Sequence, residues 1–242
     1  MYGSFAKGYH KLMADNDYEK FADYYEKIFE KFRISPGLVL DLGCGSGSLT
    51  AIMADRGYDM IGIDISPEML GIAQEENKSD NILYLCQDMR SFELYGTVDA
   101  ISSSLDCVNY LTSAKDILKM LKLLKNYLNP GGIMIFDMNT SYYFENILHG
   151  KTHIFENEDV YLVWQSDFSK KTGICRFYLD MFYREGEAYE RFYEEQRERA
   201  YGISEIAAVT EEAGHKLIAV YDAFSFKKPK EKSQRIFFII KN

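Results

Sequence analysis

The sequence predicts a protein of the α/β class, in which seven strands alternate with helices and a small antiparallel sheet is inserted. From residue 38 to about residue 137, short apolar runs alternate with stretches of helical periodicity. Between 151 and 200 this pattern gives way to strict alternation, with turn residues separating the runs. A helix and two more strands come after it. We therefore expect residues 1–150 and 201–242 to form one unit and 151–200 to form an inserted β meander.

Composition narrows the class of protein. The chain has 242 residues, 47% hydrophobic and 27% charged, which suits a globular protein with a full core. No apolar run approaches the ~20 residues of a membrane span, and the first residues lack the apolar core of a signal peptide. A net charge of −9 argues against a general nucleic-acid binder. Scattered cysteines favour reduced thiols and a cytoplasmic location. These four are Cys44, Cys86, Cys107 and Cys175.

The N-terminal region predicts one or two amphipathic helices. Aromatic and charged residues mix at helical spacing between Tyr9 and Phe32, and most of the aromatics should be core contacts with the main sheet.

A glycine turn organises the next part of the chain. Leu38–Leu42 is predicted as a buried strand with one acid, Asp41, and a helix begins near Ser48. Glycines in such a turn allow a ligand to approach backbone N–H groups at a helix N-terminus. The dinucleotide fingerprint needs glycine at the sixth position of the turn, which here is Ser48, and it needs no carboxylate at Asp41. A dinucleotide is therefore the less favoured ligand.

The next strand, 59–64, ends in Asp64. This aspartate lies about 20 residues past the first glycine of the turn, where an α/β nucleotide-binding fold places a carboxylate on a ribose. Ser66 is the better candidate for the cap of the next helix, because Pro67 follows at its first position. Ile65 and Met69 then supply apolar surface that could border a base.

Three further strands are predicted at 82–86, 98–104 and 133–137. A helix from 113 to 128 lies between the last two, and it should stop at the breaker cluster Asn129–Gly132. The carboxyl ends of such strands line the crevice in which open α/β sheets bind their ligands. Asp106 and Asn109 could bind a substrate there, or could equally serve the turn into the helix. Other residues expected at this edge are Asp88, Met89, Ser104, Tyr110, Asp137 and Asn139.

The run Asp41-Leu42-Gly43-Cys44-Gly45-Ser46-Gly47 resembles motif I of the class I S-adenosylmethionine-dependent methyltransferases. The resemblance implies a Rossmann-like, mostly parallel sheet with an antiparallel C-terminal strand, and S-adenosylmethionine as cofactor. It implies that the loop formed by Gly43, Cys44, Gly45 and Gly47 curves around the methionine part. Asp41 would lie near its ammonium group or organise the loop, Asp88 would accept a hydrogen bond from the adenine amino group, and the Met89 N–H would meet a ring nitrogen.

The segment from Tyr2 to Met13 resembles a leader found in small-molecule N-methyltransferases. In those enzymes a tyrosine-bearing segment folds across the cofactor. The resemblance makes Tyr2 and Tyr9 candidates for contacting the methionine carboxylate or the substrate.

The function expected is methyl transfer to a small-molecule acceptor, with an amine favoured over a hydroxyl; the acceptor itself is not identified. A phenol would need a base, for which the candidates are His10, Asp106 and Tyr110. Two alternatives remain, a nicotinamide-dependent oxidoreductase and a catalytically silent S-adenosylmethionine-binding protein.

The insertion is rich in aromatic and acidic residues, which would suit a roof over a cationic amine. It could instead be a lid or the surface of a homodimer. No membrane or nucleic-acid partner is expected. His149 and His153 lack a convincing third ligand, so no metal site is predicted.

Overall fold

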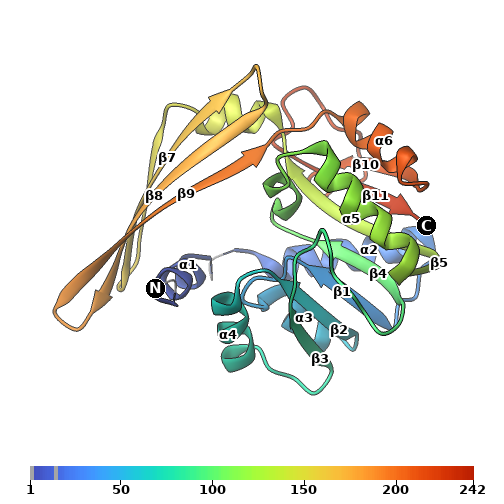
Figure 1. Ribbon diagram of the computed structural model, residues 1–242, viewed down its shortest axis with the longest axis horizontal. Helices are drawn as coiled ribbons and strands as arrows, with labels where there is room; N and C mark the ends of the chain where they lie inside the picture. The colour runs from blue at the N-terminus through green and yellow to red at the C-terminus, as the bar shows by residue number, and fades with distance from the viewer. Residues whose placement is uncertain (1–2, 14–15) are drawn as a thin grey trace.

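Two β-sheets organise the protein (Figure 1). The computed structural model describes residues 3–13 and 16–242. The first sheet has seven strands in the order β10-β11-β5-β4-β1-β2-β3, and the second has four in the order β6-β7-β8-β9. The strands of the first sheet are β1 (Leu38–Leu42), β2 (Asp59–Asp64), β3 (Ile82–Cys86), β4 (Val98–Ser103), β5 (Leu128–Asn139), β10 (Lys216–Asp222) and β11 (Arg235–Lys241).

The seven-stranded sheet has the predicted directions. β11 runs antiparallel to both of its neighbours, β5 and β10, whereas the pairs within β5-β4-β1-β2-β3 are all parallel. The carboxyl ends of these parallel strands therefore meet at one edge of the sheet. The Rossmann-like arrangement expected from the sequence is confirmed.

Helices cover both faces of this sheet. Alternate residues of β1 point to opposite faces, so that Leu40 joins the core under α5 and α6 and Val39 joins the core under α2 and α3. The result is a three-layer domain. The helices are α1 (Gly3–Met13), α2 (Tyr18–Phe32), α3 (Ser48–Asp55), α4 (Pro67–Glu76), α5 (Ala114–Tyr127) and α6 (Ile203–Glu212), with short turns η1 (Cys107–Tyr110) and η2 (Tyr143–Leu148).

One strand boundary was predicted wrongly. The breaker cluster Asn129–Gly132 does end the helix, but it lies inside β5, which begins at Leu128 instead of residue 133. The ladder between β4 and β5 shifts register between Val98 and Ala100. The two strands approach each other closely at Gly132, where a Cβ would lie only 2.6 Å from the carbonyl oxygen of Asp99. Only glycine fits at this position. The short π-helix η2 was not predicted.

The expected inserted meander is present as a separate antiparallel sheet. Its strands are β6 (Thr152–Glu156), β7 (Val160–Ser169), β8 (Ile174–Glu185) and β9 (Ala188–Arg199). One face packs on its own apolar cluster, which includes Phe144 of η2 and Phe177 of β8. The β8–β9 hairpin extends well away from the larger sheet (Figure 1).

Asn109 joins the two sheets. Its side-chain Nδ2 donates to the carbonyl oxygens of Asn139, at the end of β5, and Arg199, at the end of β9, at 3.2 and 2.8 Å. Its Oδ1 accepts from the Asn139 N–H at 3.0 Å. Asn109 is fully buried, so each of these bonds replaces hydration that the backbone groups lose.

The close approach at Gly132 yields a stability prediction. Gly132→Ala should lower the free energy of unfolding by about 1–3 kcal/mol, because the added methyl group must displace the backbone of β4 or β5. Gly96→Ala is the matched control, since nothing lies within 4 Å of its Cβ position. Urea unfolding of both variants measures the effect, and equal midpoints would contradict the steric argument.

Candidate functional site

The glycine turn at the end of β1 forms a loop that only glycine can build. Gly43, Gly45 and Gly47 all have positive φ, at 86°, 55° and 79°. The N–H groups of Gly43 and Cys44 donate to the carbonyl oxygen of Ile63 at 2.7 and 2.9 Å, which fixes the loop to β2. A Cβ on Gly43 would lie 2.9 Å from Sγ of Cys107. The bare backbone at this point leaves room that a side chain would fill.

Asp64 connects the loop to the next helix. Its Oδ2 accepts from the Gly45 N–H at 2.8 Å and its Oδ1 accepts from the Ser66 N–H at 2.9 Å. Burial raises the pKa of Asp64, and these backbone donors oppose that effect. Ser66 caps α4 by accepting from the Met69 N–H, as the sequence predicted. Ile65, beside this carboxylate, is exposed.

Asp41 lies beneath the loop, with only 2% of its surface exposed. Its carboxylate accepts hydrogen bonds from the hydroxyls of Thr50, at 2.6 Å, and Ser102, at 3.3 Å. Burial raises the pKa of Asp41 to about 6, although both hydroxyls lower it. These contacts fit the expected role of organising the loop, and a direct contact with a ligand stays a prediction.

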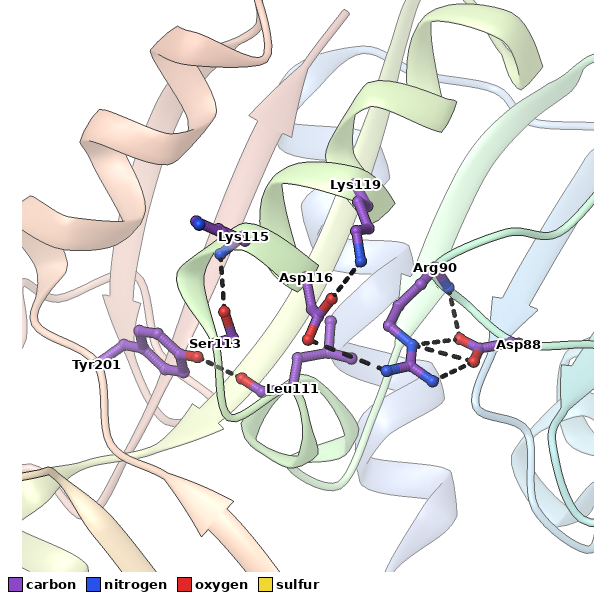
Figure 2. A network of polar contacts seen from close by, with 8 residues as sticks. All are labelled: Asp88, Arg90, Leu111, Ser113, Lys115, Asp116, Lys119 and Tyr201. Atoms are coloured by element: carbon purple, nitrogen blue, oxygen red, sulfur yellow. Dashed lines mark hydrogen bonds and ion pairs between the residues drawn. The ribbon is translucent and has the colours of Figure 1, made fainter.

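Asp88, just past β3, belongs to a charged network (Figure 2). Nε of Arg90 donates to both of its carboxylate oxygens, at 2.9 and 3.0 Å, and this partner lowers the pKa of Asp88. Arg90 also approaches Asp116 of α5, which pairs with Lys119. Nearby, the Tyr201 hydroxyl donates to the carbonyl oxygen of Leu111 (Figure 2). The network orients Asp88, and its proposed role toward adenine stays a prediction.

Helix α1 bridges the glycine loop and the inserted sheet (Figure 1). The two ring nitrogens of His10 bond Oγ of Ser46, in the loop, and Oε2 of Glu76, at the end of α4, both at 2.8 Å. Lys11 pairs with Asp159, just before β7. The structure therefore places His10 at the glycine loop and does not group it with Asp106 and Tyr110. Tyr2 lies outside the described residues.

A largely buried group of charges lies at the carboxyl ends of β4 and β5. Arg235, at the start of β11, binds Asp106 at 2.7 Å and also pairs with Asp137. The backbone N–H of Asp106 donates to Asp137 at 3.1 Å. Asp137 is fully buried, its Oδ1 has no hydrogen-bond partner, and burial raises its pKa to about 6 against the influence of Arg235.

The backbone here is strained. Leu105 and Asp106 both have positive φ, at 56° and 57°, which is costly for residues with a Cβ. These two backbone conformations turn the chain sharply after β4. The turn places Asp106 in contact with Arg235 and Cys107 beside Gly43, so the charged group lies next to the glycine loop.

Sequence reasoning missed Glu198, which reaches this group from β9. It is 2% exposed, its Oε2 has no hydrogen-bond partner, and its carboxyl group lies within hydrogen-bonding reach of Asp106. Burial and then the charge of Asp106 raise the pKa of Glu198 well above its ordinary value. No local signal distinguishes Glu198 from the other acids of β9 in the sequence.

Tyrosines border the same group. Tyr9 of α1 lies near Asp106, Cys107 and Glu198. Burial and then the charges of these groups raise the pKa of Tyr9 well above its ordinary value. The Tyr110 hydroxyl donates to Oε1 of Gln196 on β9 at 2.8 Å. Ser104 is buried and bonds the hydroxyl of Tyr25 at 2.5 Å. The structure thus brings together Tyr9, Ser104, Asp106 and Tyr110 near the glycine loop.

Among residues 3–13 and 16–242, no three His, Cys, Asp or Glu side chains form a group that could hold a metal ion. Within the same ranges, no helix combines the length and apolar character needed to cross a membrane. All four cysteines are free thiols.

The sequence and the fold of this chain are similar to those of known methyltransferases. Residues 39–132 match the model of a methyltransferase domain. YqeM of Bacillus subtilis, named as a methyltransferase, is 31% identical over 98% of this chain and 96% of its own. The crystal structure of an S-adenosylmethionine-dependent methyltransferase from Clostridium acetobutylicum is 30% identical and superimposes with a TM-score of 0.87, covering 99% of this chain and 98% of its own. The sugar N-methyltransferase KedS8 of Streptoalloteichus, 17% identical, shares the fold with a TM-score of 0.76 over 94% of this chain and 89% of its own.

The buried carboxylate beneath the loop yields a pH prediction. Because the folded-state pKa of Asp41, about 6, lies above its ordinary 3.8, its contribution to stability is full below pH 3.8 and is lost as pH rises through 6. Asp41→Asn should therefore gain about 3 kcal/mol relative to the wild type between pH 3.5 and 7. Urea unfolding at both pH values measures this, with the exposed Asp80→Asn as control. Parallel pH dependence of Asp41→Asn and wild type would contradict it.

Proposed function

The chain belongs to the class I S-adenosylmethionine-dependent methyltransferases, and we propose that its acceptor is a small molecule whose methylated atom is an amine nitrogen rather than a hydroxyl oxygen. Membership of this family makes the protein an enzyme with S-adenosylmethionine as cofactor. It also makes the alternative of a nicotinamide oxidoreductase wrong.

The loop and its surroundings fit the cofactor. We assign the methionine part to the bare backbone of Gly43 and Gly45, because a Cβ at Gly43 would fill the space beside Cys107. Asp64 keeps free lone pairs on both oxygens, so it can accept from ribose hydroxyls while it holds Gly45 and Ser66. Ile65 and Met69 would border the adenine, and Asp88 and Met89 would bind its edge. When bound, the cofactor supplies a methyl group already activated by a sulfonium, so the protein has mainly to align the acceptor.

One observation carries the choice of an amine. Beside the glycine loop, the buried Asp137 and the half-buried Asp106 share a single guanidinium, and Asp137 Oδ1 has no partner. A buried acceptor oxygen without a donor is costly, and an ammonium group would satisfy it. Cys107, which follows Asp106 directly, touches the loop at Gly43, so an acceptor bound here would adjoin the methyl donor. KedS8, by its name, methylates a sugar nitrogen, which agrees with this proposal.

We propose that the four-stranded sheet, residues 151–200, closes the acceptor site, because Gln196 and Glu198 of β9 reach toward it. Its outer residues also support the proposed homodimer. Four large apolar side chains are exposed on this sheet, namely Ile154, Phe155, Tyr189 and Tyr193.

The net charge of −9 supports a small acceptor rather than a nucleic acid. The four free cysteines support a cytoplasmic location.

Transfer of label from S-[methyl-³H]adenosylmethionine tests the acceptor class. The purified protein is offered primary amines of diverse skeleton, each paired with the alcohol or phenol of the same skeleton. We expect labelled product from amines only. Transfer confined to hydroxyl compounds would overturn the amine assignment.

The ribose role of Asp64 yields a binding prediction. Asp64→Ala should weaken binding of S-adenosylhomocysteine tenfold or more, since charged hydrogen bonds are lost and the Gly45 N–H loses its acceptor. Isothermal titration measures the change. Asp59→Ala, an exposed aspartate at the start of the same strand, is the control and should bind as the wild type does. Unchanged affinity of Asp64→Ala would remove Asp64 from the ribose role.

A further inference from the structure

Glu198 is the acid that the family resemblance does not explain. It comes from the inserted sheet, opposite Cys175 in the β8–β9 ladder, yet it is almost fully buried at the end of β9. An acid on this strand could remain in water, as Glu190 does. Its burial with Oε2 lacking a partner costs free energy, so a ligand group that donates to Oε2 would relieve that cost.

We propose that Glu198 is the catalytic residue that takes the proton from the acceptor, a small primary or secondary amine that arrives as an ammonium ion. This rests on the proposed function, since it names the chemistry of the same acceptor site. The carboxyl groups of Glu198 and Asp106 lie within hydrogen-bonding reach, and Arg235 holds Asp106 in place at 2.7 Å. Asp106 therefore acts as a positioning residue for Glu198.

The charges around Glu198 decide its state. Two adjacent carboxyl groups away from water retain one proton between them, and burial and then the charge of Asp106, which pairs with Arg235, raise the pKa of Glu198 well above its ordinary value. Glu198 is then neutral in the free enzyme and ionises when an ammonium ion lies against it. The titratable and charged groups that face Glu198 are Asp106, Arg235, Tyr9, Tyr110, Tyr143 and Cys175.

The reaction balances with this assignment. The ionised Glu198 removes one proton from the bound ammonium, which frees the nitrogen lone pair. The nitrogen then forms the new N–C bond while the C–S bond breaks and its electron pair stays on sulfur. The methylated product leaves as an ammonium ion, and Glu198 is left protonated, as it is in the free enzyme. The proton released to water is the one that Glu198 loses when the ammonium ion binds. Each turnover thus releases one proton, and no oxidant or metal is needed.

Tyr9 and helix α1 cover this group from the side of the glycine loop. The last turn of α1 makes partly exposed polar contacts, His10 with Ser46 and Glu76 and Lys11 with Asp159.

The test compares Glu198→Gln with the wild type in labelled-methyl transfer to an amine that the wild type methylates. Loss of a general base should lower kcat by a factor of about 100 or more, because glutamine fills the same space but takes up no proton. Binding of S-adenosylhomocysteine, measured by titration, should be unchanged and reports that the variant is folded. Glu190→Gln, on the same strand but exposed, should retain wild-type transfer.

The pH profile separates a catalytic from a structural role. In the wild type, kcat should fall toward acid as Glu198 becomes protonated in the complex, and this limb should disappear in Glu198→Gln. Asp106→Asn, which removes the neighbouring charge, should shift the limb toward lower pH. Wild-type kcat and an unchanged limb in Glu198→Gln would overturn the assignment while leaving the proposed function intact. If the wild type binds S-adenosylhomocysteine but methylates no amine, the proposed function fails and the role of Glu198 fails with it.

Discussion

The buried amide of Asn109 is the constraint on which the site depends. It fixes the end of β5 and the end of β9 to the same short turn, at distances between 2.8 and 3.2 Å. Because Glu198 immediately precedes the residue that Asn109 holds, this bond delivers an acid of the inserted sheet to the edge of the larger one. Without it, the seven-stranded sheet would retain its glycine loop, but the proposed acceptor site would lose the support of β9.

The charges at the carboxyl ends of β4 and β5 lower the stability of the fold. Asp106, Asp137 and Glu198 meet one guanidinium, and two carboxyl oxygens have no partner. Desolvated acids of one sign disfavour the fold unless they are protonated or paired. Strained φ angles at Leu105 and Asp106 add to the cost. Such local conflicts are expected where a protein keeps groups for chemistry instead of packing.

Local patterns explain why so much of the core could be predicted. Strand periodicity, the glycine turn and the acid at the end of β2 are each encoded within a few residues, so their positions could be read from the sequence. The burial of Glu198 could not be predicted from the sequence, because β9 carries other glutamates of the same character, namely Glu190, Glu194 and Glu195. Only the packing of β9 against η1 distinguishes Glu198 from them. Two other contacts also join residues that are distant in the chain and could not be predicted from local patterns. They are the hydrogen bond of His10 with Ser46 and the close approach of Gly132 to Asp99.

The four-stranded insertion leaves the chain after β5 and returns before α6, so both of its ends meet the core near Asn109. Its remaining length lies away from the glycine loop. Under the proposal that this sheet closes the acceptor site, substitutions at the end of β9 that faces Asp106 would change the acceptor while the residues assigned to the cofactor keep their contacts. Because the insertion meets the core at so few points, such a change of acceptor would not require a change of methyl donor.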